Sequence, residues 1–265
     1  MRLLRQPGII VSGLIIVLTV AVMLLPSLFA THDPFEGVAV DRLQGPNGTY
    51  FFGTDHLGRD LYSRVVYGAF LSLASAGTAV LVGVVVGAVV GLLSGFIGGR
   101  VDFVIMRFVD VLIAVPSILL ALIVVASLGF GPWSVALGVG LGATGSFTRI
   151  MRSQVVRVRN EEYVEAARTL GVRWPSILFS HILPNSARPV IAYAALELGT
   201  AILAVSALSF LGFGAQPPEP EWGALVSGGR DYVATAWWLS ILPGVVVLAV
   251  VLAVNRLARL IGGDR

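Results

Sequence analysis

The chain has 265 residues, of which 56% are hydrophobic and only 12% are charged, and its mean hydropathy is +0.89. Soluble domains carry about a quarter charged residues, so this composition excludes an ordinary soluble domain and predicts an all-α integral membrane protein. The chain has no cysteine and no lysine, which excludes disulfides, thiolate chemistry, Schiff-base catalysis and a Walker-type nucleotide site. The formal charge of +3 is not gathered in one patch, so no nucleic-acid partner is expected.

Six apolar segments are predicted to cross the bilayer, for which about 20 residues suffice. They are residues 9–30, 71–97, 104–128, 133–148, 190–213 and 238–260. The first segment follows Arg2 and Arg5, and a secretory signal peptide is its alternative interpretation. Because its apolar run is too long for a typical signal peptide and no clear cleavage site follows, it is interpreted as a retained span. Pro116 is predicted to kink the third segment.

The positions of the arginines predict the orientation of these spans. Six spans leave both termini on one side, and if that side is cytoplasmic, most arginines face inward, including seven between residues 149 and 188. The outer segments then hold four arginines, which are Arg42, Arg59, Arg64 and Arg230. This asymmetry follows the positive-inside rule. The sequence therefore predicts cytoplasmic termini, an outer loop at residues 31–70 and a cytoplasmic loop at residues 149–188.

The cytoplasmic loop has the pattern of two short helices. Asn160 is a predicted N-cap, and Gly171 stands where a left-handed residue would end a helix of about ten residues. Trp174-Pro175 opens a second short helix, because proline fits a first helical turn. This second helix is predicted to stop before Pro184.

The first of these helices has features of a docking surface. Ala166 and Ala167 are predicted to share one face that lets a partner approach closely, while Glu165 and Arg168 are able to pair across an interface. The alternative is a surface connector that lies on the lipid headgroups. The residues alone leave both interpretations open.

The spacing of Glu165-Ala166-Ala167, Gly171 and Leu183-Pro184 resembles the EAA loop of ABC importer permeases. In that family the loop is a coupling helix that seats in a groove of the ATPase subunit. The resemblance implies an ATPase-coupling role for Glu165, Ala166, Ala167, Arg168, Gly171, His181, Leu183 and Pro184. His181 departs from the family pattern, which often has isoleucine at this place.

Two further stretches resemble one branch of this family. Phe52–Leu73, which reads FGTDHLGRDLYSRVVYGAFLSL, is similar to the signature of dipeptide and oligopeptide permeases, specifically of the C-type subunit of the permease pair. Leu208–Gly214 and the PPEPEWG that follows soon after resemble the same branch. Phe70 stands where the family usually has arginine, and Val205 stands where glutamate is common.

The resemblance implies a single permease domain over residues 1–265 with the type I ABC importer fold, in a bacterial inner membrane. The expected partners are a second permease in a heterodimer, two ATPase subunits or domains, and an extracytoplasmic binding protein that delivers dipeptides, oligopeptides or similar cargo. ATP and magnesium are expected on the ATPase partner. This chain is expected to hold no cofactor and not to be an enzyme itself.

Four glycines recur at every fourth residue of the second span, and they are Gly83, Gly87, Gly91 and Gly95. Such a stripe lets another helix backbone approach closely. Packing within the bundle is the favoured interpretation, and a sliding surface for gating is the alternative.

Acidic residues inside a membrane are candidates for function. Glu197 is a candidate pathway residue, for which a proton or cargo role and an interhelical hydrogen bond both stay open. A proton-coupled secondary transporter that uses Glu197 is the alternative function. Asp110 is interpreted as an interfacial residue paired with Arg107, one helical turn away.

The outer loop carries Asp55, His56 and Asp60 within six residues. These groups could suggest a metal site, but they are too few without further ligands, and no metal is expected. Arg59 and Arg64 lie among them and are expected to pair with the acids. The favoured role is loop folding at the outer face, where a substrate-binding protein could meet the chain.

Overall fold

The computed structural model describes residues 7–262, and in this part of the chain it contains helices and no strand. Arg2, Arg5 and Arg265, which contributed to the predicted orientation, lie outside the described residues. The long helices are α1 (Pro7–Leu24), α3 (Leu61–Ile97), α4 (Gly99–Ala114), α5 (Ser117–Leu128), α6 (Pro132–Arg159), α9 (Leu183–Phe210) and α11 (Trp238–Gly262). The short ones are α2 (Pro26–Phe29), η2 (Ala39–Asp41), α7 (Glu162–Thr169), α8 (Trp174–Ser176), η3 (Ile177–Ile182), α10 (Trp222–Gly228) and η4 (Arg230–Tyr232).

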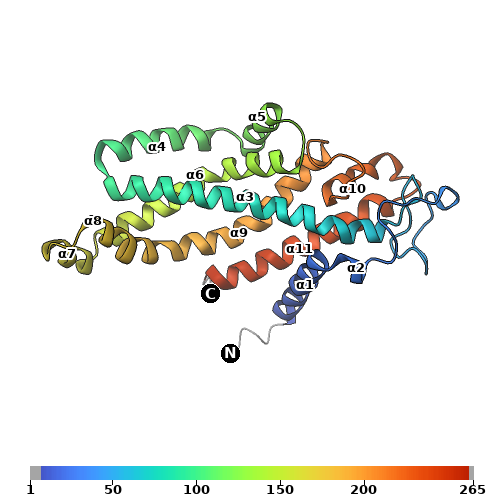
Figure 1. The fold of residues 1–265 in the computed structure, drawn as a ribbon, viewed down its shortest axis with the longest axis horizontal. Helices are drawn as coiled ribbons and strands as arrows, with labels where there is room; N and C mark the ends of the chain where they lie inside the picture. Colours follow the sequence, from blue (N-terminus) through green and yellow to red (C-terminus); the bar gives the residue numbers. More distant parts are fainter. Residues whose placement is uncertain (1–6, 263–265) are drawn as a thin grey trace.

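The long helices form one elongated bundle along a common axis (Figure 1). In chain order, α1, α3, the α4–α5 pair, α6, α9 and α11 alternate in direction along that axis. Helix α3 packs along α6, α9 packs on α11 and α6, and α1 packs on α11. Helix α7 lies at one end of the bundle, whereas α10 and the 30–60 loop (residues 30–60) lie at the other.

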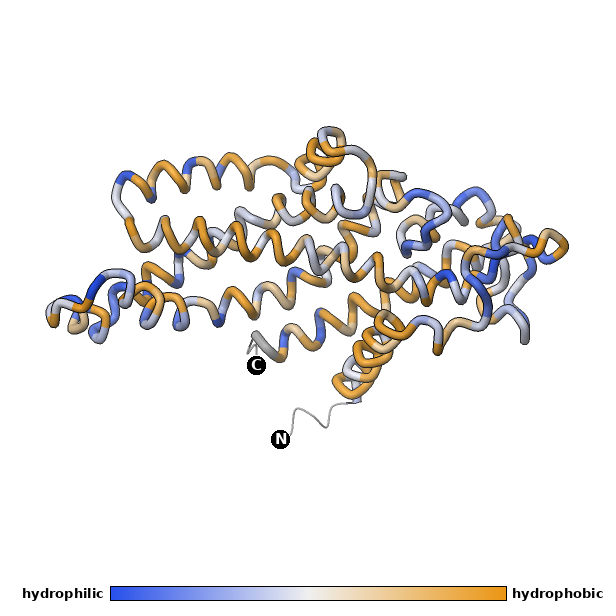
Figure 2. The backbone as a smooth tube through the Cα atoms, viewed as in Figure 1, coloured by the Kyte–Doolittle hydropathy of each residue, from blue (hydrophilic) through white to orange (hydrophobic). Residues whose placement is uncertain are grey.

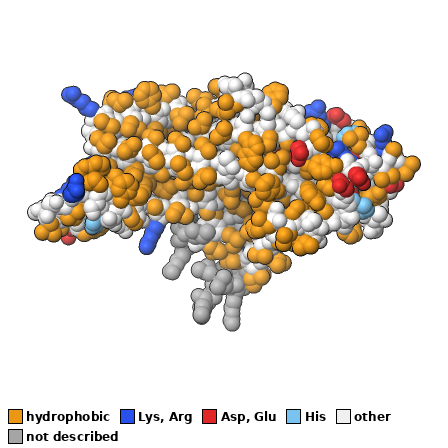
Figure 3. Space-filling model, viewed as in Figure 1, with side chains coloured by type: hydrophobic (Ala, Val, Ile, Leu, Met, Phe, Trp, Pro, Cys, Tyr) orange, Lys and Arg blue, Asp and Glu red, His pale blue; other side chains and the backbone are white. Residues whose placement is uncertain are grey.

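The surface of the bundle has the polarity of a membrane protein. Apolar residues cover its middle in the tube view (Figure 2). Charged side chains gather mainly at the two ends of the visible face (Figure 3). Many large apolar side chains on α1, α3, α4, α5, α9 and α11 are exposed, as expected where the surroundings are lipid rather than water. The predicted all-α membrane protein is therefore confirmed.

Within residues 7–262, four helices are long and apolar enough to span a membrane, and the bent α4–α5 pair makes a fifth. These are α1, α3, α11 and the continuous helical run Trp174–Phe210. The predicted fourth span, residues 133–148, forms the first half of α6, and α6 is not apolar enough to count among these spans. Glycine, serine and threonine dilute its apolar character, and four arginines follow in the same helix. Helix α6 nevertheless runs beside α3 through the bundle.

The third predicted span is interrupted rather than gently kinked. Helices α4 and α5 meet at an angle of 92°, with Val115 and Pro116 both in extended conformations. Proline lacks an amide hydrogen and disfavours helical geometry in the residue before it, so it ends α4 at Ala114. Pro116 is therefore a break between two helices.

The prediction that a helix stops before Pro184 is wrong. Trp174–Phe210 is helical throughout, because the six residues of η3 adopt a π-helix that leads directly into α9. Pro184 falls in the first turn of α9, directly after the π-helix. The loop between α6 and α9 is thereby reduced to α7 and its two short connections.

The predicted outer loop is also shorter than residues 31–70. Helix α3 begins at Leu61, and Asp60 caps it by accepting a hydrogen bond from the Ser63 amide at 3.0 Å. With 37 residues, α3 is about 55 Å long, far more than the roughly 30 Å of a bilayer core. Its first turns therefore extend beyond the apolar layer and support the 30–60 loop.

Candidate functional site

A compact knob, residues 160–183, forms one end of the bundle (Figure 1). The prediction that Asn160 is the N-cap of α7 is wrong. Asn160 ends α6, because its amide donates to the carbonyls of Arg157 and Val158. The residue before α7 is Glu161, with extended backbone angles and no side-chain cap. The carboxylates of Glu162 and Glu165 lie in the first turn, where the helix dipole favours negative charge.

The other end of α7 closes as the sequence predicts. Gly171 has a φ of +77°, in the left-handed region that favours glycine. Its amide donates to the Arg168 carbonyl, and the Val172 amide donates to the Ala167 carbonyl, both at 3.0 Å. This pair of bonds is the Schellman arrangement, which satisfies carbonyls at a helix end and turns the chain sharply.

The two alanines of the knob do not share an accessible face. Val164 and Ala167 are buried and pack with Ile177 and Ile182 of η3, whereas Ala166 is exposed. The prediction of one common face is therefore wrong for Ala167, because η3 occupies the space beside it. The small side chain of Ala167 allows η3 to approach α7 from within the knob.

The outward side of the knob carries both charges and large apolar groups. Glu165 and Arg168 are exposed. Leu170 is 83% exposed and Trp174 is 63% exposed, and Tyr163 is also exposed. This end of the bundle therefore carries three large exposed apolar side chains beside charged residues.

The remaining predicted coupling residues support the knob from the α9 side. His181 is half-buried, and its ring stacks on that of Tyr163 with 6.4 Å between centroids. Leu183 packs against the buried cluster beneath α7, whereas Pro184 is exposed. His181 thus contacts α7, while Leu183 and Pro184 form its base.

Ion pairs link α4 to α6 near the knob. Asp102 is bound by Arg152, and Asp110 is bound by Arg149 at 2.7 Å. The predicted pairing of Asp110 with Arg107 is wrong, because the Arg107 guanidinium lies over the ring of Phe103 at 5.4 Å. These pairs join two helices and do not place an acid in the bundle interior.

All four glycines of the stripe face α6. A Cβ atom on Gly87 would lie 2.5 Å from Cβ of Phe147, and one on Gly91 would lie 2.5 Å from the Thr148 carbonyl oxygen. One on Gly95 would lie 2.9 Å from Cβ of Val155, and one on Gly83 would lie 3.1 Å from the Phe147 ring. The stripe therefore lies in the contact between α3 and α6, as the packing interpretation predicts.

Glu197 lies half-buried in the middle of α9, 14 residues after the helix begins at Leu183. Tyr193, one turn before it, packs its ring against Phe147 of α6 with 4.9 Å between centroids. Among the described residues, no three histidine or acidic side chains are grouped so that they could hold a metal ion. The structure thus places Glu197 one helical turn from the contact between Tyr193 of α9 and Phe147 of α6.

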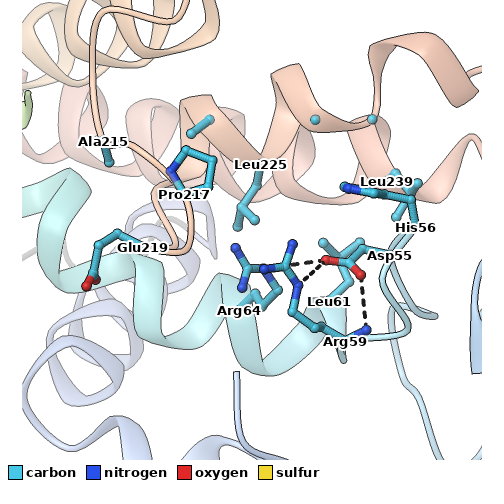
Figure 4. A pocket seen from close by; sticks show the side chains of 13 residues that line it. Asp55, His56, Arg59, Leu61, Arg64, Ala215, Pro217, Glu219, Leu225 and Leu239 are labelled. Carbon is cyan, nitrogen blue, oxygen red and sulfur yellow. Dashed lines mark hydrogen bonds and ion pairs between the residues drawn. The ribbon is translucent and has the colours of Figure 1, made fainter. Parts of the chain in front are cut away.

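A small pocket of about 120 Å³ lies at the opposite end, between the 30–60 loop and α10 (Figure 4). Asp55 points toward two guanidinium groups, with Oδ2 at 2.7 Å from Nε of Arg59 and 3.8 Å from Nε of Arg64. Asp55 also accepts bonds from the amides of Leu57 and Arg59. Asp55 thus pairs with both arginines as expected, whereas Asp60 binds Ser63 and Thr31 instead. Both acids hold the loop together, in agreement with the favoured interpretation.

A buried carboxyl that the sequence did not indicate lies beside this pocket. Glu221 is fully buried, accepts bonds from the Ser72 hydroxyl at 3.0 Å and the Ala224 amide at 2.9 Å, and caps α10. Burial raises the pKa of Glu221 above its ordinary value, although these hydrogen bonds act in the opposite direction. Glutamate is an uncommon N-cap. Only its position directly before Trp222-Gly223 could have indicated that Glu221 caps α10.

The fold and the knob together define a class of protein. An elongated bundle of membrane helices ends in a knob that displays leucine and tryptophan beside charged residues. Residues 83–263 match the family described as the inner membrane component of binding-protein-dependent transport systems, and the chain belongs to this family. It is thus a multi-pass permease of the ABC importer type, a class that is not itself catalytic.

Curated relatives match nearly the whole chain. The dipeptide transport system permease protein DppC of Alkalihalophilus pseudofirmus is 41% identical over 94% of this chain and 80% of its own length. The probable D,D-dipeptide permease DdpC of Escherichia coli is 39% identical over 94% and 84%. The glutathione permease GsiD of Pectobacterium atrosepticum is 38% identical over 97% and 85%.

Solved structures share the fold. An inward-facing MetNI methionine ABC transporter chain matches with a TM-score of 0.56 at 18% identity, over 76% of this chain and 97% of its own. A chain from an amino acid ABC transporter matches with a TM-score of 0.57 at 15% identity, over 75% and 92%. The predicted type I importer fold is confirmed, and these matches give the proton-coupled alternative no support.

Proposed function

We propose that this chain is the C-type permease subunit of an ATP-driven importer of dipeptides, oligopeptides or similar peptide-like cargo. The observation that carries the proposal is the α7 knob, which combines a rigid Schellman end with an 83% exposed leucine, Leu170. The names of the relatives at 38–41% identity support peptide-like cargo. No enzyme activity is assigned to the chain itself.

The proposed partners follow from this role. A second permease completes the transport path, two ATPase subunits bind ATP and magnesium, and an extracytoplasmic binding protein delivers the cargo. The knob meets an ATPase subunit through Glu165, Ala166, Arg168 and Leu170, which are all exposed. Ala167, Gly171, His181, Leu183 and Pro184 shape and support that surface.

The proposed orientation has the knob and both termini in the cytoplasm of a bacterial cell. The arginines of α6 and the knob lie at one end of the bundle, in agreement with the positive-inside rule. The start of α1 and the end of α11 point away from α10 and the 30–60 loop (Figure 1). The 30–60 loop and α10 then face the binding protein.

The proposed mechanism is a change between two conformations. ATP binding draws the ATPase subunits together and moves the knob with them, and α6 and α9, which flank the knob, tilt against the second permease. The cytoplasmic side of the path closes while the outer side opens. A short, firmly packed α7 suits this role, because a flexible segment would absorb the movement.

The direct test is purification of the tagged wild-type chain from its native membrane, with Glu165→Arg and Leu170→Asp variants, followed by identification of the bound proteins. We expect an ATPase and a second permease with the wild-type chain and loss of the ATPase alone from the variants. Arg42→Glu, at the opposite end, is the control and retains the ATPase. A wild-type chain that purifies without an ATPase would refute the proposal.

A further inference from the structure

The end of α3 nearest the knob is held by a single arginine of α6. Arg159 Nη1 donates to the carbonyl of Gly95 at 3.1 Å and to the carbonyl of Phe96 at 2.9 Å. These are last-turn carbonyls of a helix, which lack α-helical partners and carry partial negative charge. A guanidinium is therefore well suited to cap them.

Arg159 occupies a particular position in the chain. It is the last residue of α6, and only Asn160 and Glu161 separate it from α7. The cap consequently fixes the beginning of the knob to α3. Arg157, two residues earlier, is exposed and does not make this contact.

The same turn of α3 also holds the far side of the knob. The ring of Phe96 packs against that of Trp174, with 6.0 Å between centroids. Trp174 begins α8, directly after the turn that follows α7. Both connections of α7, one through Arg159 and one through Trp174, therefore meet α3 at Gly95 and Phe96.

The opposite end of α3 is joined to the structures around α10. The indole of Trp222 donates to the Val65 carbonyl at 2.9 Å, and the Trp222 amide donates to the Ser72 hydroxyl at 2.9 Å. Arg64 donates to the Pro34 carbonyl of the 30–60 loop at 2.7 Å. Helix α3 thus connects the two ends of the molecule without a break over its 37 residues.

We infer that Arg159 is a positioning residue that makes α3 move with α7, so that a displacement of the knob reaches α10 and the 30–60 loop through α3 as well as through α6 and α9. This inference rests on the proposed function, because it takes α7 to be the element that the ATPase moves. Arg159 acts through the carbonyls of α3 and not by touching ATP or cargo. Its replacement leaves the outward surface of α7 intact.

The test uses the complete complex in lipid nanodiscs and compares Arg159→Met, Arg159→Lys and the control Arg157→Met. We expect Arg159→Met to bind the ATPase as wild type does but to hydrolyse about tenfold more ATP per molecule transported, because both charge-assisted hydrogen bonds to α3 are lost. Arg159→Lys, which keeps a charged donor, should restore part of the coupling. Arg157→Met should match wild type.

A distance measured between α3 and α7 reports their relative movement, which a purely structural role of Arg159 would not affect. The chain has no native cysteine, so spin labels attach only at Ile97→Cys on α3 and Thr169→Cys on α7 when the partner subunits are also cysteine-free. We expect the label distance to stay constant between nucleotide-free and ATP-bound states in wild type and to change in Arg159→Met. If Arg159→Met fails to fold, the wild-type label distance still tests the inference, because a change of that distance between the two states would overturn it.

The outcomes separate this inference from the proposed function. Absence of an ATPase from the wild-type complex refutes the proposed function. If the ATPase binds but Arg159→Met couples transport as Arg157→Met does, or if the wild-type label distance changes between states, only the role of Arg159 is overturned.

Discussion

Arg152 of α6 binds Asp102 of α4 through two parallel hydrogen bonds, from Nε to Oδ1 and from Nη2 to Oδ2. The Ser94 hydroxyl of α3 donates to the same carboxylate. One aspartate thereby joins three helices near the knob. Charge-assisted bonds of this two-pronged kind are among the stronger polar contacts in proteins.

We predict that Asp102→Ala destabilises the chain by about 1–3 kcal/mol, because it leaves Arg152 and Ser94 without their partner. Asp110→Ala is the matched control. Its pair with Arg149 is about half exposed on both sides, and exposed ion pairs contribute about 0–1 kcal/mol. Thermal unfolding midpoints in detergent should fall clearly for the first variant and little for the second, and equal shifts would contradict the prediction.

The contact between α3 and α6 depends on glycine at Gly87. We predict that Gly87→Leu destabilises the protein by about 3 kcal/mol, since the larger side chain would overlap Phe147 and the backbone of Thr144. Gly77→Ala, in the same helix with nothing within 4 Å of its added Cβ, should gain about 1 kcal/mol of helix propensity. The yield of monodisperse protein after heating measures both effects. A tolerated Gly87→Leu would mean that α3 and α6 pack differently.

The turn at Gly171 should be required for coupled transport. Gly171→Val places a β-branched residue at a φ of +77°, at a local cost of about 1–2 kcal/mol. We expect this variant to hydrolyse ATP without matching uptake. Asn tolerates the left-handed conformation, so Gly171→Asn should retain most uptake. Normal uptake by the valine variant would show that the shape of this turn is not needed.

Glu221 should make stability depend on pH. Because burial raises its folded-state pKa above the unfolded value, the folded chain holds this proton more tightly. Stability should therefore fall as pH rises from the ordinary glutamate range through the raised value and then level off. Glu221→Gln stays neutral and should lack this decrease. Unfolding midpoints of both chains across pH measure the difference, and parallel curves would contradict the prediction.

Local chemistry made part of this structure predictable from the sequence. The membrane class followed from composition, the left-handed Gly171 from its position after a short amphipathic helix, and the distortion at Pro116, predicted as a kink and observed as a break, from its missing amide hydrogen. Each of these depends on a few neighbouring residues, so no knowledge of distant contacts was needed.

Other features depend on contacts between distant segments. Ala167 is buried because the π-helix η3 folds back on α7, and the same π-helix carries the chain past Pro184. Asp110 pairs with Arg149 because α4 lies against α6, where the bent α4–α5 pair brings it. The cap that Arg159 makes on Gly95 joins residues 64 positions apart, and the hydrogen bond from Ser72 to Glu221 joins residues 149 positions apart. Sequence spacing carries little information about such pairs.

We propose that ATP, and not a proton gradient, drives uptake through this chain. Reconstitution of the full complex in liposomes with the binding protein and a labelled dipeptide tests this directly, with ATP and an imposed proton gradient supplied separately. We expect uptake that requires ATP, persists when the proton gradient is collapsed, and is lost in Leu170→Asp. Uptake that follows the proton gradient without ATP and disappears in Glu197→Gln would contradict it.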